Sequence, residues 1–96
     1  MPERAHIYIT GRVQGVGFRY STYHVARQFG LAGWVRNVED GRVEAVFLGN
    51  RETIQRMLAW CRHGPPGSFV ENLDVTWDET ADGPVEFRIE PTVDGS

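Results

Sequence analysis

The sequence predicts an α+β fold in which an antiparallel sheet carries two helices on one face. Two observations lead to this prediction. Apolar and polar residues alternate in several stretches of the 96-residue chain, as they do in half-buried strands. In two further stretches the apolar residues recur every three or four positions, which is the spacing of a helix with one buried face. The order of these stretches along the chain then sets the topology.

A cluster of glycines separates the first predicted strand from the first predicted helix. Residues 5–10 (AHIYIT) alternate and predict the strand. Residues 11–17 (GRVQGVG) contain three glycines and interrupt the alternation. Helical spacing from Phe18 to Phe29 predicts the helix, and Gly30 follows as a residue that commonly ends a helix in the left-handed conformation.

A hairpin is predicted next. Residues 31–38 (LAGWVRNV) and residues 41–49 (GRVEAVFLG) are rich in residues that favour strands. Between them, Glu39–Asp40–Gly41 is a typical turn sequence, because glycine tolerates the left-handed backbone that tight hairpin turns require. The two strands are therefore expected to pair with each other.

The second helix has clear signals at both ends. Asn50 suits the position before the first turn, because its side chain can accept a hydrogen bond from a free backbone N–H. Residues 64–67 (GPPG) end the helix. The apolar residues between these signals fall on one helical face and are Ile54, Met57, Leu58 and Cys61.

The C-terminal part of the chain predicts two more strands. Residues 69–77 alternate, and residues 85–90 (VEFRIE) predict a short last strand that we expect to form an extra hairpin. Residues 91–96 are expected to be loosely held. The residues predicted to share a buried face are Leu73, Val75 and Trp77 in the first of these strands, and Val85, Phe87 and Ile89 in the second.

The resulting order, β-α-β-β-α-β, predicts a ferredoxin-like two-layer sandwich. We expect a single domain over residues 1–96, with a core from about residue 5 to 91. A helical crossover makes the first and second strands parallel. If the third strand lies between them, their C-terminal ends share one sheet edge and lie about 10 Å apart. The glycine loop (residues 11–17) is therefore expected to neighbour Arg36 and Asn37.

The charge balance argues against nucleic-acid and membrane-surface partners, because the net charge is −3 and no run of like charges occurs. All ten basic residues are arginines, which excludes lysine nucleophiles and the lysine of a phosphate-binding P-loop. Cys61 is the only cysteine, so no internal disulfide is expected. We find neither a signal-peptide pattern nor an apolar run of the ~20 residues that a membrane span needs, and we expect a cytoplasmic protein.

The glycine loop has the features of an anion site. A glycine-rich turn that leads into a helix directs backbone N–H groups and the positive end of the helix dipole at one point. Gly15 and Gly17 let an anion approach the backbone, and Arg19 in the first helical turn can add a planar guanidinium. The alternative is a tight turn with a solvated arginine, and the spacing by itself does not decide between the two.

Four segments, GRVQGVGFR, GWVRN, DGRVEAVF and GPPGSFV, together resemble the acylphosphatase family, over about residues 5 to 91. The resemblance implies hydrolysis of the carboxyl–phosphate bond of acyl phosphates, without a metal, a cofactor or a phosphoenzyme. It also implies that Arg19 binds the phosphoryl group and that Asn37 positions the attacking water. The residues implied for the phosphate-binding loop are Gln14, Gly15, Val16, Gly17, Phe18 and Arg19.

The residue types are consistent with this chemistry. The leaving carboxylate is a weak base, so no strong general acid is required, and no acidic residue stands in the loop. Asn37 has no basic nitrogen near neutral pH and can act only by orienting water. Gln14 is expected to contribute its backbone N–H rather than its side chain. His6, His24 and His63 have no metal-ligand spacing.

Two other functions stay open at this point. One is a non-catalytic ferredoxin-like module that binds a small anion or RNA. The other is a homologue that acts on carbamoyl phosphate, since acylphosphatase-like domains also head larger hydrogenase-maturation proteins. We expect a small-molecule acyl phosphate and inorganic phosphate or a similar anion as partners, no nucleic acid, no membrane, and a monomer.

Overall fold

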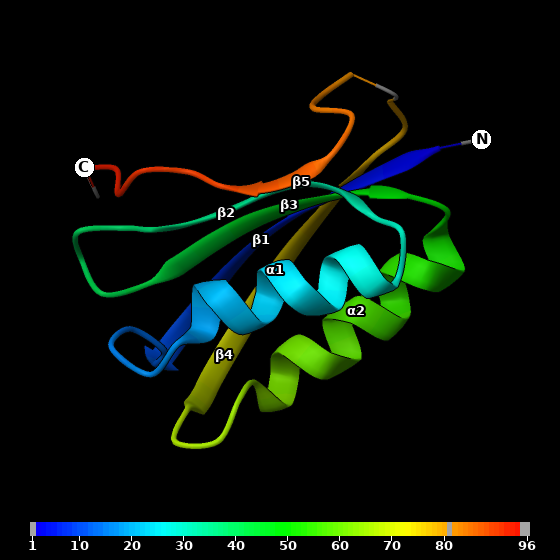
Figure 1. The fold of residues 1–96 in the computed structure, drawn as a ribbon. Coiled ribbons are helices and arrows are strands. Elements are labelled where there is room, and N and C mark those ends of the chain that lie inside the picture. The colour runs from blue at the N-terminus through cyan, green and yellow to red at the C-terminus, as the bar shows by residue number, and fades with distance from the viewer. Residues whose placement is uncertain (1, 81, 95–96) are drawn as a thin grey trace.

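The element order predicted from the sequence is confirmed in the computed structural model, which describes residues 2–80 and 82–94. One sheet has the strand order β4-β1-β3-β2-β5, and both helices cover the same face of it (Figure 1). The elements are β1 (Glu3–Arg12), α1 (Phe18–Gln28), β2 (Ala32–Asn37), β3 (Val43–Gly49), α2 (Arg51–His63), β4 (Phe69–Asp78) and β5 (Phe87–Ile89).

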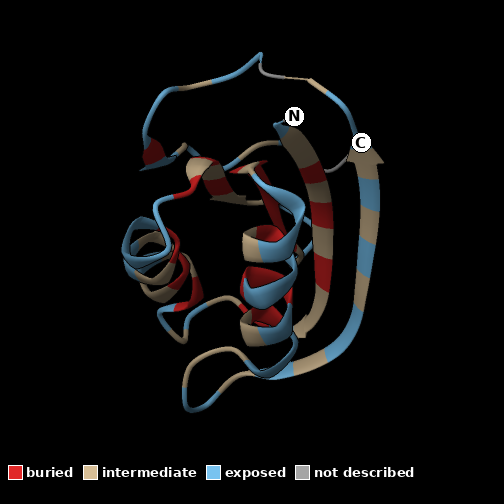
Figure 2. Ribbon diagram, turned by 90° about the vertical axis from the view of Figure 1, so that its right-hand side faces the viewer, coloured by how far each residue is buried: buried red, intermediate tan, exposed pale blue. Residues whose placement is uncertain are grey.

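The core lies between the sheet and the two helices, where buried residues of both layers face each other (Figure 2). The predicted stripe of α2 is confirmed, because all four of its apolar residues are buried. The helix start is confirmed too, since the Asn50 side-chain oxygen accepts a hydrogen bond of 2.8 Å from the backbone N–H of Thr53. Cys61 is fully buried, and burial raises the pKa of its thiol.

The predicted hairpin between β2 and β3 is also confirmed, with Val38 N–H donating to the Arg42 carbonyl at 2.9 Å. Both β1 and β2 are antiparallel to β3, which lies between them. β1 and β2 therefore run parallel to each other, and their C-terminal ends lie at the same end of the sheet. In the part of the chain that the structure describes, neither helix is long and apolar enough to cross a membrane.

The last strand differs from the prediction. We expected an extra hairpin, but β5 crosses to the opposite edge of the sheet and pairs parallel to β2, so the sheet is mixed. The cause is the burial of Phe87, which is only 2% exposed and stacks on Phe47 of β3 with ring centroids 5.6 Å apart. Val85 lies outside β5 and is 94% exposed, so the predicted common face is reduced to Phe87 and the half-exposed Ile89.

The segment after β5 is held more firmly than predicted. Val93 forms a parallel bridge with Val38. Its N–H donates to the Asn37 carbonyl at 3.0 Å, and its carbonyl accepts from Glu39 N–H at 2.9 Å. This pairing braces the C-terminal end of β2, a role that no pattern in the sequence indicates. Residues 95–96 of the predicted loose tail lie outside the described residues.

Candidate active site

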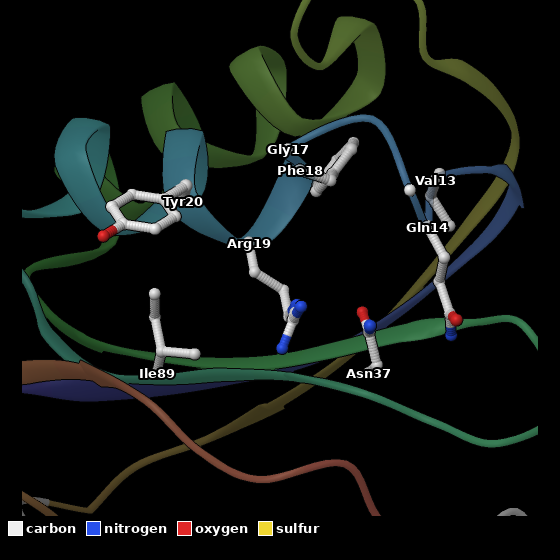
Figure 3. A pocket seen from close by; sticks show the side chains of 9 residues that line it. Val13, Gln14, Gly17, Phe18, Arg19, Tyr20, Asn37 and Ile89 are labelled. Atoms are coloured by element: carbon white, nitrogen blue, oxygen red, sulfur yellow. The ribbon is translucent and has the colours of Figure 1, made fainter.

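A cleft of about 200 Å³ opens between the glycine loop, the start of α1 and the ends of β2 and β5 (Figure 3). It brings together Arg19 and Asn37, for which the family resemblance implies catalytic roles, although 18 positions separate them. The lining residues are Val13, Gln14, Gly15, Gly17, Phe18, Arg19, Tyr20, Asn37 and Ile89.

The glycine loop exposes its backbone to the cleft. Gly15 and Gly17 have φ angles of 76° and 77°, in the left-handed region that favours glycine. Apart from the glycine and its two chain neighbours, no described heavy atom lies within 4 Å of the position that a Cβ would take at either residue, so the space beside the backbone is open. Gly17 precedes the first turn of α1, where no side chain caps the helix and no acidic residue stands. The helix N-terminus therefore presents unused N–H groups beside the cleft.

Arg19 extends from the first turn of α1 into the cleft, and its guanidinium lies beside Asn37 (Figure 3). Within the described residues, its side chain makes no ion pair or hydrogen bond. In contrast, the arginines that form ion pairs there are Arg4, Arg36, Arg42, Arg51, Arg56 and Arg88. The cleft thus holds a cation whose charge no carboxylate of this described part balances.

Asn37 is the last residue of β2, and its side-chain amide points into the same cleft (Figure 3). Its Oδ1 atom is buried and has no hydrogen-bond partner within the described residues. Buried polar atoms in proteins are normally satisfied by protein groups, water or a ligand. The Asn37 amide is therefore free to hold a water molecule, while its own backbone carbonyl is fixed by Val93.

Gln14 uses its side chain in a way that the sequence did not indicate. Its Nε2 group donates to the carbonyls of Val38 and Arg42, at 2.7 Å and 2.9 Å. These bonds tie the glycine loop to the hairpin that follows Asn37. We expected only the backbone N–H to matter, and that contribution stays a prediction.

The other loop residues divide between the cleft and the core. Phe18 lines the cleft but is buried, and its ring lies 5.8 Å from that of Trp60 on α2. Val16 is the one predicted loop residue that does not line the cleft, and it packs against the core instead. The apolar side chains of the loop therefore anchor it, and the glycines leave its backbone accessible.

The family model for acylphosphatase matches residues 5–89. The chain belongs to the acylphosphatase family. A curated acylphosphatase from a Nostoc species is 58% identical over 76 residues, which are 79% of this chain and 75% of that protein. Membership makes this chain a hydrolase of the acylphosphatase type.

Solved structures agree with this assignment. The crystal structure of acylphosphatase from Bacillus subtilis superimposes with a TM-score of 0.89 at 39% identity, over 92% of this chain and 98% of that one. Full-length HypF, solved in a phosphate- and nucleotide-bound form, matches with a TM-score of 0.89 at 26% identity. That match covers 99% of this chain but only 12% of HypF.

Tyr20 and Ile89 also line the cleft, and neither was predicted from the sequence as a site residue. Tyr20 directly follows Arg19, but helical spacing gives no sign that an exposed tyrosine borders a site. Ile89 reaches the cleft only because β5 crosses to the edge next to β2. The partner of a strand depends on long-range packing, so local alternation could not reveal this contact.

Arg36, next to Asn37, turns to the other face of the sheet. Its Nε donates to Glu44 at 2.8 Å, and His6 Nε2 lies 2.6 Å from the same carboxylate. Burial would raise the pKa of Glu44, but hydrogen bonds from Arg36, His6 and Tyr8 bring it below the ordinary value. The hydrogen bond to Glu44, with burial, raises the pKa of Tyr8. Glu44 thus balances the charge of Arg36 away from the cleft. Among the residues that the structure describes, Arg19 is the only charged one that lines the cleft.

Proposed function

We propose that this chain hydrolyses the carboxyl–phosphate bond of acyl phosphates through Arg19, the glycine-loop amides and Asn37. The observation that supports it most is that two groups without a partner among the described residues, the Arg19 guanidinium and the Asn37 amide oxygen, border one cleft. In this proposal Arg19 and the backbone amides of residues 14–19 hold the phosphoryl oxygens. A planar guanidinium can contact two such oxygens at once.

The proposed reaction is a direct displacement by water. The oxygen of a water held by Asn37 attacks phosphorus, and the bond between phosphorus and the acyl oxygen breaks. The carboxylate leaves with the electron pair of that bond. The proton of the attacking water passes to a phosphate oxygen, because Asn37 cannot accept it. Inorganic phosphate and a carboxylate are the products.

The electrostatics of the cleft suit this displacement. Negative charge on the phosphoryl oxygens is stabilised by groups that are already in place, namely the guanidinium and the N–H groups at the start of α1. Asn37 adds position rather than charge, because it places the water on one side of the phosphoryl group. This combination requires no acidic residue in the cleft, and none of the described residues that line it is acidic.

Phosphate release from benzoyl phosphate in the presence of EDTA tests this proposal. We expect turnover by the wild type, and a loss of about 100-fold or more in Arg19→Gln. Arg62→Gln is the matched control, because Arg62 is an exposed arginine on α2 that does not line the cleft. Equal rates in wild type and Arg19→Gln would show that the site is assigned wrongly. Phosphate binding without turnover would favour a binding module instead.

We also propose that the protein acts in the cytoplasm as a monomer. The proposed location is supported by the single cysteine, which is buried and forms no disulfide, because disulfides are rare in cytosolic proteins. Size-exclusion chromatography with light scattering measures the mass directly. A species of about 11 kDa is expected from the chain mass of 10.9 kDa, and a dimer would refute the monomer.

A further inference from the structure

The cleft has an apolar side that the reaction itself does not use. Tyr20 of α1 and Ile89 of β5 lie on the side of Arg19 away from Asn37 (Figure 3). Tyr20 is 67% exposed and Ile89 is 36% exposed. The Tyr20 ring stacks on His24, with centroids 5.7 Å apart, so a neighbour on its own helix supports it. Its hydroxyl has no hydrogen bond within the described residues.

The direction of the displacement determines which side of the cleft the acyl group of the substrate faces. In phosphoryl transfer the attacking and leaving oxygens lie roughly in line across phosphorus. If the water is held at Asn37 and the phosphoryl group at Arg19, the leaving oxygen points away from Asn37. The acyl group attached to that oxygen then extends toward Tyr20 and Ile89. This step rests on the proposed function, because it uses the roles proposed for Arg19 and Asn37.

We propose that Tyr20 and Ile89 bind the acyl group of the substrate and favour acyl phosphates with an aromatic or branched apolar acyl group. The ring of Tyr20 and the side chain of Ile89 offer apolar surface that such a group would remove from water. Within residues 2–80 and 82–94, Arg19 is the only charged residue that lines the cleft. In the proposed function its guanidinium binds the phosphoryl group. An acyl group that carries a carboxylate of its own would therefore find no second cation among the described residues that line the cleft.

The test compares kcat/KM for benzoyl phosphate with kcat/KM for acetyl phosphate in each variant. The ratio of the two removes any change that affects the phosphoryl end alone. We expect Tyr20→Ala to lower this ratio about ten-fold, because one lost apolar contact in a pocket has an effect of that order. Tyr20→Phe keeps the ring and should keep the ratio. Ile89→Ala should lower the ratio in the same direction.

Phe69→Ala is the matched control. Phe69 lies on β4, is 65% exposed, and does not line the cleft, so its loss should leave the ratio unchanged. Inhibition by inorganic phosphate should be the same in wild type and Tyr20→Ala, which shows that the phosphoryl end is intact.

Failure of the acyl contact and failure of the proposed function give different results. If wild type hydrolyses both substrates but Tyr20→Ala and Ile89→Ala keep its ratio, the inferred acyl contact is wrong and the proposed function stands. If wild type hydrolyses neither substrate, the proposed function fails and the acyl contact fails with it.

Discussion

In the described part of the protein, the partly buried guanidinium of Arg19 has no ion pair, and the buried Oδ1 atom of Asn37 has no hydrogen-bond partner. Folding normally pairs such groups, because an unsatisfied buried donor or acceptor costs about 1–3 kcal/mol. Both groups face the same cleft, where a bound oxyanion and a water molecule would satisfy them. In the proposed function, Arg19 contacts the phosphoryl group and Asn37 contacts the attacking water.

Gln14 illustrates how a side chain can act through its neighbours. Gln14→Leu removes the two hydrogen bonds to the hairpin carbonyls, and we expect it to lower the free energy of unfolding by about 1–2 kcal/mol. Because the loop would then shift relative to Asn37, kcat should fall at least about ten-fold. Urea unfolding and benzoyl phosphate turnover measure the two effects. Gln55→Leu, at an exposed position on α2, is the control, and wild-type kcat in Gln14→Leu would rule out the positioning role.

Glu44 should make stability depend on pH. The folded state lowers its pKa, so the ionised carboxylate stabilises the fold at neutral pH, and this contribution disappears as pH falls through the lowered pKa. We expect Glu44→Gln to cost about 2 kcal/mol at pH 7, since hydrogen bonds to an ionised group are lost. The difference from wild type should shrink below about pH 4.

Urea titrations at pH 7 and pH 3.5 measure this difference. Glu71→Gln serves as the control, because Glu71 is exposed and has no side-chain partner within the described residues. A deficit in Glu44→Gln that is the same at both pH values would show that its carboxylate does not carry the effect.

Among the strands, β5 depends on one residue for its position. Phe87 is its only buried side chain, and it stacks on Phe47 and contacts Tyr23. We expect Phe87→Ala to lower the free energy of unfolding by about 3 kcal/mol, as for other buried aromatic residues. Val85→Ala, two residues earlier and exposed, should change it by less than about 0.5 kcal/mol. Chemical denaturation that finds the two variants equally stable would contradict the role of Phe87 as the anchor of β5.

The helices and the first four strands could be predicted because each has a local signal. The apolar stripe of α2, its Asn50 cap and the turn at Glu39–Gly41 depend only on neighbouring residues. The position of β5 could not be predicted, because alternation identifies a strand but not its partner. The bracing of Asn37 by Val93 was missed for the same reason, since backbone pairing at a strand end leaves no mark on composition.

In the molecule as a whole, one end of the sheet collects segments from four parts of the chain. The glycine loop, the start of α1, the end of β2 and the end of β5 meet there, and the tail braces the arrangement. The proximity of the loop to Asn37 followed from the topology, because a crossover brings the ends of β1 and β2 to one sheet end. The apolar side of the cleft could not be predicted from that topology, because it depends on the position of β5.

The proposed mechanism is tested most directly by measuring phosphate binding and benzoyl phosphate turnover separately in Asn37→Ala. The same two measurements are made on Arg19→Gln for comparison. Inorganic phosphate at ten times its Kd should stabilise wild type by about 1.4 kcal/mol and raise Tm by about 5 °C or more. We expect Asn37→Ala to keep this shift while its turnover of benzoyl phosphate falls about 100-fold. Arg19→Gln should lose both. Wild-type turnover in Asn37→Ala, or loss of its phosphate-induced shift, would contradict the division of roles between the two residues.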